Sequence, residues 1–323
     1  MEEKLIFKPI SLNDKDLIES YLKKTKVKSY EYTFTTLYMW RNLSNIKYTI
    51  IYNTLILLKY EENKGFFFMM PCGYTNENLT KIVDCLYEYK KLSGSIYYLF
   101  GDIEEYFIKD LKLYTSYNFD LTEDTSDYEY IYNTSDLIKL EGKKYHSKRN
   151  HCSQFKLLYD YRIKDIDSED TISDCINLLN EWHIHNEINS EELKAEIYAI
   201  EDLLYKLSIL NLNSIAIYVG KQLVGFSIGE SHFDTAIIQV ERCNTNYKGI
   251  YSFINNEFLI KDFSNTIYVN REEDCGSFGL RKAKKSYHPV YLLNKYLINI
   301  IKKGAVSDWI NKFNLNTAPF FVR

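Results

Sequence analysis

Residues 214–242 read SIAIYVGKQLVGFSIGESHFDTAIIQVER, and this stretch decides the fold of the second half of the chain. It holds three apolar runs, separated by Gly220-Lys221 and by Phe233-Asp234. Because glycine and aspartate favour tight turns between strands, the pattern predicts a three-stranded antiparallel meander at 214–219, 222–231 and 235–242.

The periodicity of the apolar residues predicts the elements around this meander. In the second half we expect helices at about 145–158, 172–182, 193–207, 249–262 and 277–287, with strands at 161–166, 266–270 and 290–300. In the first half we expect helices at about 13–22, 34–40, 79–87 and 104–111, a hairpin of 48–60 and 65–70, and strands at 96–100 and 127–132. The fold class is therefore mixed α/β (α+β).

Composition excludes several classes of protein. The 323 residues suffice for two domains, and 46% hydrophobic with 26% charged residues is globular. No signal peptide or membrane-length apolar run is visible, so we expect a soluble, cytoplasmic protein without integral membrane contact. Six scattered cysteines predict reduced thiols and no metal site. A net charge of −4 argues against DNA binding.

Charge is unevenly distributed along the second half. Residues 139–164 carry eight Lys/Arg against two acids, and residues 165–202 carry twelve acids against one lysine. The basic segment is either an ordinary solvated surface or a binding surface for a phosphate-rich ligand.

Three stretches carry a resemblance to a known family: residues 128–140, Gly142 to Asn150 (GKKYHSKRN), and Asn270 to Gly276 (NREEDCG) followed by Gly279 to Tyr287 (GLRKAKKSY). They resemble the C-terminal domain of phosphatidylglycerol lysyltransferase, over about residues 1–300. The order of elements after Ser214 is similar to the core of GNAT acyltransferases. The resemblance implies two tandem GNAT-like domains, each a mostly antiparallel sheet flanked by helices: a degenerate one at 1–133 and a second at 134–310, with a tail at 311–323.

The resemblance also implies a donor site. GNAT enzymes hold the donor's pyrophosphate in a loop before a helix, which in this sequence would be Asn246 to Tyr251, including Lys248 and Gly249. Asn246 stands where Arg or Gln is usual, and Tyr251 stands where a small residue is usual. Tyr251 would crowd the pyrophosphate, so we expect weak binding of acetyl-CoA. An acyl-CoA or an aminoacyl-tRNA remains the expected donor.

The resemblance implies candidate catalytic residues as well. Glu241, near the end of the third meander strand, would be the general base, and Tyr287 would give the leaving group its proton. Asp274 would hold an acceptor amine, orient Arg281, or merely form a turn. The remaining candidates are cations that would hold phosphate groups: Arg281 and Lys284 on one helical face with Lys285, and Lys144 and Lys148 one turn apart.

Three functions remain open from the sequence. The first is an acyl- or aminoacyltransferase acting on an amine or hydroxyl. The second is a non-catalytic GNAT-like binding or regulatory protein, and the third is a module that binds aminoacyl-tRNA.

Overall fold

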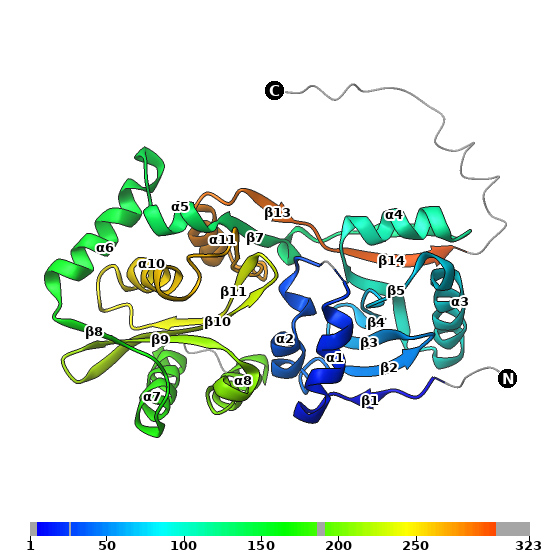
Figure 1. Ribbon diagram of the computed structural model, residues 1–323, viewed down its shortest axis with the longest axis horizontal. Helices are drawn as coiled ribbons and strands as arrows, with labels where there is room; N and C mark the ends of the chain where they lie inside the picture. Colours follow the sequence, from blue (N-terminus) through cyan, green and yellow to red (C-terminus); the bar gives the residue numbers. More distant parts are fainter. Residues whose placement is uncertain (1–4, 26, 186–190, 302–323) are drawn as a thin grey trace. The chain divides into compact units, whose positions relative to one another are not determined.

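The structure is a computed structural model that describes residues 5–25, 27–185 and 191–301, and the chain divides into two compact units (Figure 1). Among these residues, unit 1 contains those before Pro9, residues 48–123 and those from Lys295 on, and unit 2 contains 9–47 and 124–294. Both units are thus assembled from separated segments, whereas the sequence predicts continuous domains at 1–133 and 134–310. The predicted tail at 311–323 lies outside the described residues.

Unit 1 is built on a seven-stranded sheet in the order β1-β2-β3-β4-β5-β14-β6. The strands are β1 (Lys8–Pro9), β2 (Lys47–Ile51), β3 (Thr54–Glu61), β4 (Gly65–Phe68), β5 (Ile96–Ile103), β6 (Asn118–Thr122) and β14 (Tyr296–Ile301). Among the described residues of this unit, the helices are α3 (Asn76–Ser93) and α4 (Glu105–Tyr114). α3 begins with a capping box of Thr75 and Asn78 and ends at Gly94 in the left-handed conformation.

Unit 2 is built on a second seven-stranded sheet in the order β13-β7-β12-β11-β10-β9-β8. Its strands are β7 (Glu129–Asn133), β8 (Tyr161–Lys164), β9 (Asn213–Val219), β10 (Gln222–His232), β11 (Thr235–Cys243), β12 (Tyr268–Asn270) and β13 (Tyr291–Leu293). Its α-helices are α1 (Lys15–Leu22), α2 (Phe34–Met39), α5 (Thr134–Lys139), α6 (His146–Leu158), α7 (Glu169–His185), α8 (Glu191–Leu204), α9 (Leu207–Leu210), α10 (Ile250–Asp262) and α11 (Phe278–Lys285). Short 3₁₀ turns lie at Leu12–Asp14, Tyr30–Tyr32, Thr125–Asp127 and Lys143–Tyr145.

Helices cover both faces of the unit 2 sheet. α6 and α10 lie on one face, and α7 and α8 lie on the other (Figure 1). The predicted meander is present as β9, β10 and β11, antiparallel in sequence order. Phe155 of α6, Phe253 of α10 and Val224 of β10 are fully buried between helices and sheet, and this burial fixes the helices on the sheet.

Two central strands of the unit 2 sheet, β11 and β12, pair over only part of their length. β11 pairs in parallel with β12 only at Thr235, Ala236 and Ile237. Beyond Ile237 the rest of β11 pairs with β10 alone among the strands of the described residues. On the β12 side, this second half of β11 therefore has no strand neighbour among the described residues; we call this unpaired stretch the opening beside β11, and residues from other elements contact it.

Two predicted strands are each divided in the structure. The segment 48–60 becomes β2 and β3, because Tyr52 and Asn53 both take positive φ (48° and 55°) and form a tight turn. The segment 290–300 becomes β13 and β14, which belong to different sheets. Periodicity cannot reveal such breaks, since the residues on both sides of each break have strand-like patterns.

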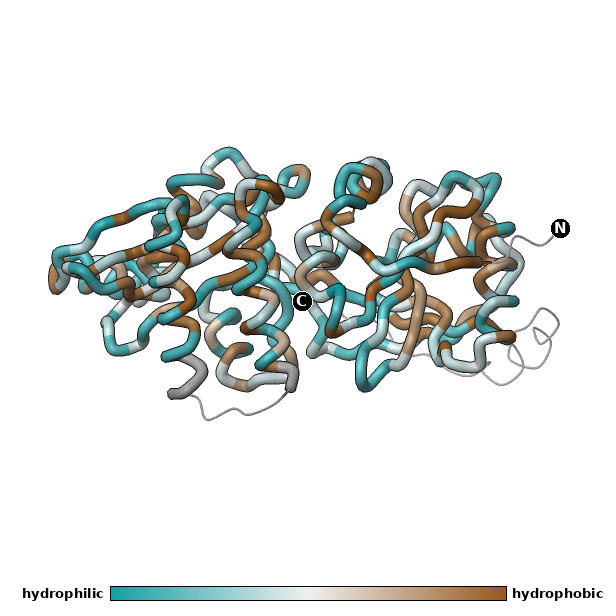
Figure 2. Tube along the Cα trace, turned by 90° about the horizontal axis from the view of Figure 1, so that it is seen from below, coloured by the Kyte–Doolittle hydropathy of each residue, from teal (hydrophilic) through white to brown (hydrophobic). Residues whose placement is uncertain are grey.

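No helix among residues 5–25, 27–185 and 191–301 is long and apolar enough to cross a membrane. Along the trace, hydrophilic positions interrupt the hydrophobic ones within the helices (Figure 2). This alternation is typical of helices that bury one face in a protein core.

Candidate functional site

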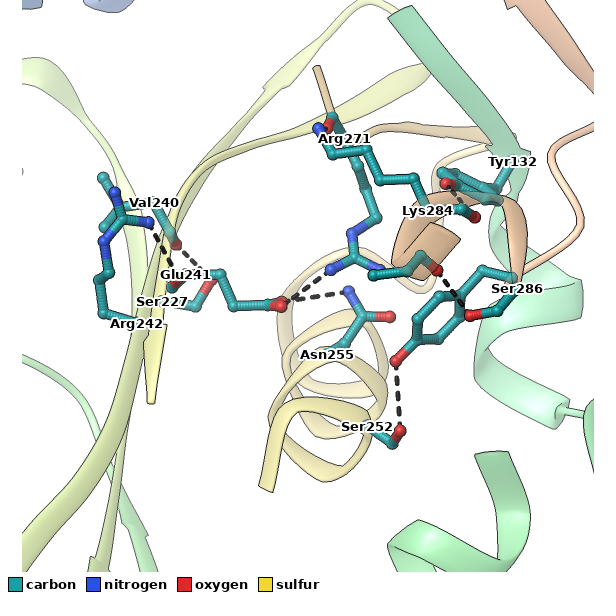
Figure 3. A network of polar contacts seen from close by, with 12 residues as sticks. Tyr132, Ser227, Val240, Glu241, Arg242, Ser252, Asn255, Arg271, Lys284 and Ser286 are labelled. Carbon is teal, nitrogen blue, oxygen red and sulfur yellow. Dashed lines mark hydrogen bonds and ion pairs between the residues drawn. The ribbon is translucent and has the colours of Figure 1, made fainter. Parts of the chain in front are cut away.

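Glu241 lies on the part of β11 that faces the opening in the sheet. Successive residues of a strand point to opposite faces, so Glu241 turns toward α10 while Arg242 turns toward α8 and pairs with Glu196. The Glu241 carboxylate accepts a hydrogen bond from Arg271 Nη2 at 2.8 Å and a longer one from Asn255 Nδ2 at 3.4 Å (Figure 3). Both oxygens of this predicted base are therefore occupied by partners.

Arg271 links Glu241 to Tyr287. It follows β12 directly, and its side chain is only 14% exposed, against 9% for Glu241. The centre of its guanidinium lies 4.8 Å from the centroid of the Tyr287 ring. Sequence reasoning missed Arg271 as a site residue, although a charged residue directly after the apolar strand at 266–270 is a usable signal.

Tyr287 is buried at the end of the segment that follows α11. Its hydroxyl lies 3.3 Å from Ser252 Oγ, and Ser252 Oγ lies 3.4 Å from His151 Nδ1. The Tyr287 carbonyl accepts a hydrogen bond from the Tyr145 hydroxyl at 3.1 Å. Burial raises the pKa of Tyr287, so the phenol is protonated at neutral pH and can act as a proton donor.

Lys148 reaches the same tyrosine from α6. Its Nζ lies 3.7 Å from the centroid of the Tyr287 ring. Burial, together with the positive charge of Arg271, lowers the pKa of Lys148 to about 8. The structure therefore brings Glu241, Tyr287 and Lys148 together around Arg271, in the opening beside β11.

Asp274 does not belong to this group. Its buried carboxylate accepts hydrogen bonds from Arg281 Nε (2.8 Å), Arg281 Nη2 (2.9 Å), the Tyr130 hydroxyl (2.7 Å) and the Gly276 amide (3.0 Å). The Arg281 contacts, with those of Tyr130 and Gly276, hold the pKa of Asp274 at about 2. Three roles were expected for Asp274: holding an acceptor amine, orienting Arg281 or forming a turn. The two hydrogen bonds from Arg281 match the second of these roles.

Lys284 differs from the sequence-based expectation of an exposed cation. Its side chain is buried, and its Nζ donates hydrogen bonds to the carbonyls of Arg271 and Glu273. Arg281 and Lys284 thus both have protein partners, whereas Lys285 on the same helix is exposed. All three residues lie on α11, but helical spacing could not show which of them the rest of unit 2 covers.

The predicted donor loop, Asn246 to Tyr251, leads into α10, whose first residue is Ile250 and whose N-cap is Gly249. Gly249 has a φ of +84°, and a Cβ built on it would lie 2.1 Å from the His151 carbonyl oxygen. Glycine is required here because the loop crosses the backbone of α6 closely. The glycine in this loop is therefore explained by a contact with the backbone of α6 at His151, without any bound donor.

A pocket of 170 Å³ lies over this loop, lined by His151, Thr245 and residues 247–252. Asn246 and Lys248 are exposed, and Tyr251 is half-buried, with its pKa raised to about 12 by burial. Lys144 is also exposed, and its Nζ lies 3.4 Å from Asp136. Lys148 and Lys144, one turn apart in the sequence, therefore have different surroundings.

Comparisons with known proteins fit this architecture. The family described as "Phosphatidylglycerol lysyltransferase, C-terminal" matches residues 23–299. A conserved protein of unknown function from Bacteroides thetaiotaomicron is 31% identical, with a TM-score of 0.84 over 93% of this chain and all of that one. An uncharacterized protein of Mycoplasmoides gallisepticum is 27% identical over 58% of this chain, and the match spans 60% of that relative.

Two further structures share the fold at low identity. L-PGS from Bacillus licheniformis is 13% identical, with a TM-score of 0.62 over 94% of this chain and 96% of that one. FemX is 8% identical, with a TM-score of 0.60 over 94% of this chain and 99% of that one. The two helix-flanked sheets are accordingly a tandem GNAT-like fold, and the chain belongs to the family of the phosphatidylglycerol lysyltransferase C-terminal domain.

Proposed function

We propose that this chain transfers an acyl or aminoacyl group from a phosphate-bearing donor, either aminoacyl-tRNA or acyl-CoA, to an amine or hydroxyl. The observation that carries the proposal is the group Glu241–Arg271–Tyr287 in the opening beside β11. Membership of a family named for a lysyltransferase supports the reaction class.

The residues of this group offer the chemistry that acyl transfer needs. Tyr287 is a buried, neutral phenol that can protonate the leaving oxygen or sulfur. Arg271, held by Glu241, is a fixed positive charge that can stabilise the oxyanion formed when the donor carbonyl is attacked. The pocket over residues 247–252, with the exposed Lys248 and Lys144 as candidate phosphate contacts, would take the donor.

The test is a transfer assay with labelled aminoacyl-tRNAs and acyl-CoA species, each offered with amine and hydroxyl acceptors. We expect Tyr287→Phe to lower kcat by about 100-fold, the lower range for a lost general acid. Tyr218→Phe is the matched control, because its hydroxyl contacts Asp174 of α7 on the opposite face of the sheet. If Tyr287→Phe is as active as the wild type, Tyr287 is not the general acid.

A non-catalytic binding protein is the second candidate, and the donor loop favours it. Gly249 serves a close contact with α6, and Tyr251 occupies part of the wall where a donor pyrophosphate would approach. This candidate predicts a thermal shift with charged tRNA or a CoA species but no transferred label with any acceptor. Turnover of any donor would exclude it.

A further inference from the structure

Three lysines in or just before α6 lie over aromatic rings, namely Lys144, Lys148 and Lys156, and the surroundings of Lys148 differ from those of the other two. Lys144 pairs with Asp136, and Lys156 pairs with Glu257 at 2.6 Å. Lys148 forms no hydrogen bond or ion pair with any of the described residues, and its Nζ instead lies 3.7 Å from the centroid of the Tyr287 ring. A half-buried ammonium without a counterion is unfavourable, so this position makes the neutral amine easier to form than it is in an exposed lysine.

The titratable groups that face Lys148 come from four elements. They are Cys152 on α6, Glu241 on β11, Arg271 after β12 and Tyr287 after α11. Burial raises the pKa of both the Cys152 thiol (to about 11) and the Tyr287 phenol, so both are neutral. Glu241 and Arg271 neutralise each other through their 2.8 Å ion pair. Among these four groups no net negative charge is left to offset the desolvation of the Lys148 ammonium, and the face of the Tyr287 ring offsets it only in part, since the pKa is still lowered.

Glu241, by contrast, already has a protein partner on each of its two carboxylate oxygens. Oε1 accepts from Arg271 and Oε2 accepts from Asn255. A proton taken by Glu241 would break the ion pair and leave the Arg271 guanidinium buried without a counterion. Glu241 therefore fits a positioning residue, and the base has to come from another side chain in the opening.

We propose that Lys148, as the neutral amine, is the general base of the transfer reaction, an inference that rests on the function proposed above. Its Nζ takes the proton of the acceptor amine or hydroxyl while the acceptor atom bonds to the donor carbonyl carbon. The bond from that carbon to the leaving oxygen or sulfur breaks, and Tyr287 gives the leaving atom its proton. Lys148 then releases one proton to water, and the Tyr287 phenolate takes one from water.

Lys148→Arg separates this role from that of a phosphate clamp. Arginine keeps the positive charge and the long stem but cannot lose its proton at working pH. If Lys148 is the base, Lys148→Arg should lower kcat by about 100-fold or more. The KM for the donor should stay within about twofold of the wild-type value. We also expect wild-type kcat to rise about tenfold per pH unit up to pH ~8, the value to which its pKa is lowered, and to level above it.

The matched control is Lys156→Met, two turns along α6, where the ammonium is paired with Glu257. We expect this variant to keep wild-type kcat. A Lys148→Arg enzyme with wild-type kcat would overturn the proposal. If Lys148→Met raises KM and leaves kcat unchanged, the residue binds the donor and the proposal fails as well.

A readout without turnover is the pH dependence of Lys148 acetylation by acetic anhydride, followed by mass spectrometry on the full chain. We expect half-maximal reactivity near pH 8 for Lys148 and at a clearly higher pH for Lys156, whose pKa the Glu257 contact raises. Half-maximal reactivity of Lys148 near pH 10 would overturn the base. If Lys148 of the wild type is acetylated with a midpoint near pH 8 but the enzyme turns over no donor, the proposed function is wrong, and the role of Lys148 as its base is wrong with it. If Lys148→Arg turns over donor at the wild-type rate, only the role of Lys148 as the base is wrong.

Discussion

Replacing Glu241 by alanine removes the counterion of Arg271 inside unit 2. The two side chains are 9% and 14% exposed, so the remaining guanidinium cannot regain full hydration. Breaking a buried ion pair by removing one partner costs about 3–5 kcal/mol, whereas an exposed pair is worth less than about 1 kcal/mol. Because neither side chain is fully buried, we expect Glu241→Ala to lower the free energy of unfolding by about 3 kcal/mol.

The measurement is urea denaturation at neutral pH, followed by circular dichroism. Lys156→Ala is the control, because it removes an ion-paired lysine that is 46% exposed, and we expect it to cost less than about 1 kcal/mol. A double variant, Glu241→Leu with Arg271→Met, removes both charges and should recover most of the loss. If Glu241→Ala costs no more than Lys156→Ala, or if the double variant is less stable than Glu241→Ala, then the pair is not a buried, coupled unit.

Three further predictions concern other parts of unit 2. Because the folded-state pKa of Asp274 is lowered to about 2, its contribution of about 2 kcal/mol is present above pH ~4 and lost as the pH falls toward 2; acid titration of stability should show this loss in the wild type and not in Asp274→Asn. Gly249→Ala should destabilise by about 3 kcal/mol through its positive φ and the His151 carbonyl, while Gly279→Ala, with nothing within 4 Å, should be neutral or slightly stabilising in thermal melts. Tyr251→Ala should bind acetyl-CoA at least about tenfold more tightly by calorimetry, a gain of about 1.4 kcal/mol; micromolar binding by the wild type, unchanged in the variant, would refute the steric argument.

The meander and the helix after it could be predicted from the sequence because their signals are local. Glycine and aspartate mark the turns of residues 214–242, and the apolar spacing of α10 is regular. The placement of residues 9–47 with unit 2 has no such signal, because it depends on contacts made far along the chain. One of these contacts is made by the side-chain amide of Gln239, which donates hydrogen bonds to Thr33, the N-cap of α2, and to Thr36 within α2.

The candidate site shows the same division. The positions of Glu241 and Tyr287 were suggested by the resemblance to a family, and the structure places both around Arg271. The burial of Lys284 and the missing counterion of Lys148 could not be predicted, because both lysines lie in basic stretches that look alike in sequence. Which cation is covered, and by what, depends on side chains from other strands and helices.

The position of β14 has a consequence for how the chain is made. β14 lies between β5 and β6 in its sheet, yet it is synthesised after residues 124–294, which belong to unit 2. While the ribosome extends the chain through those residues, β5 and β6 lack their shared neighbour and expose unpaired backbone groups. We therefore expect unit 1, whose first strands are made early, to complete its sheet only after unit 2 has been synthesised. The nascent chain should need chaperone protection until residue 301, the last of β14, has left the ribosome.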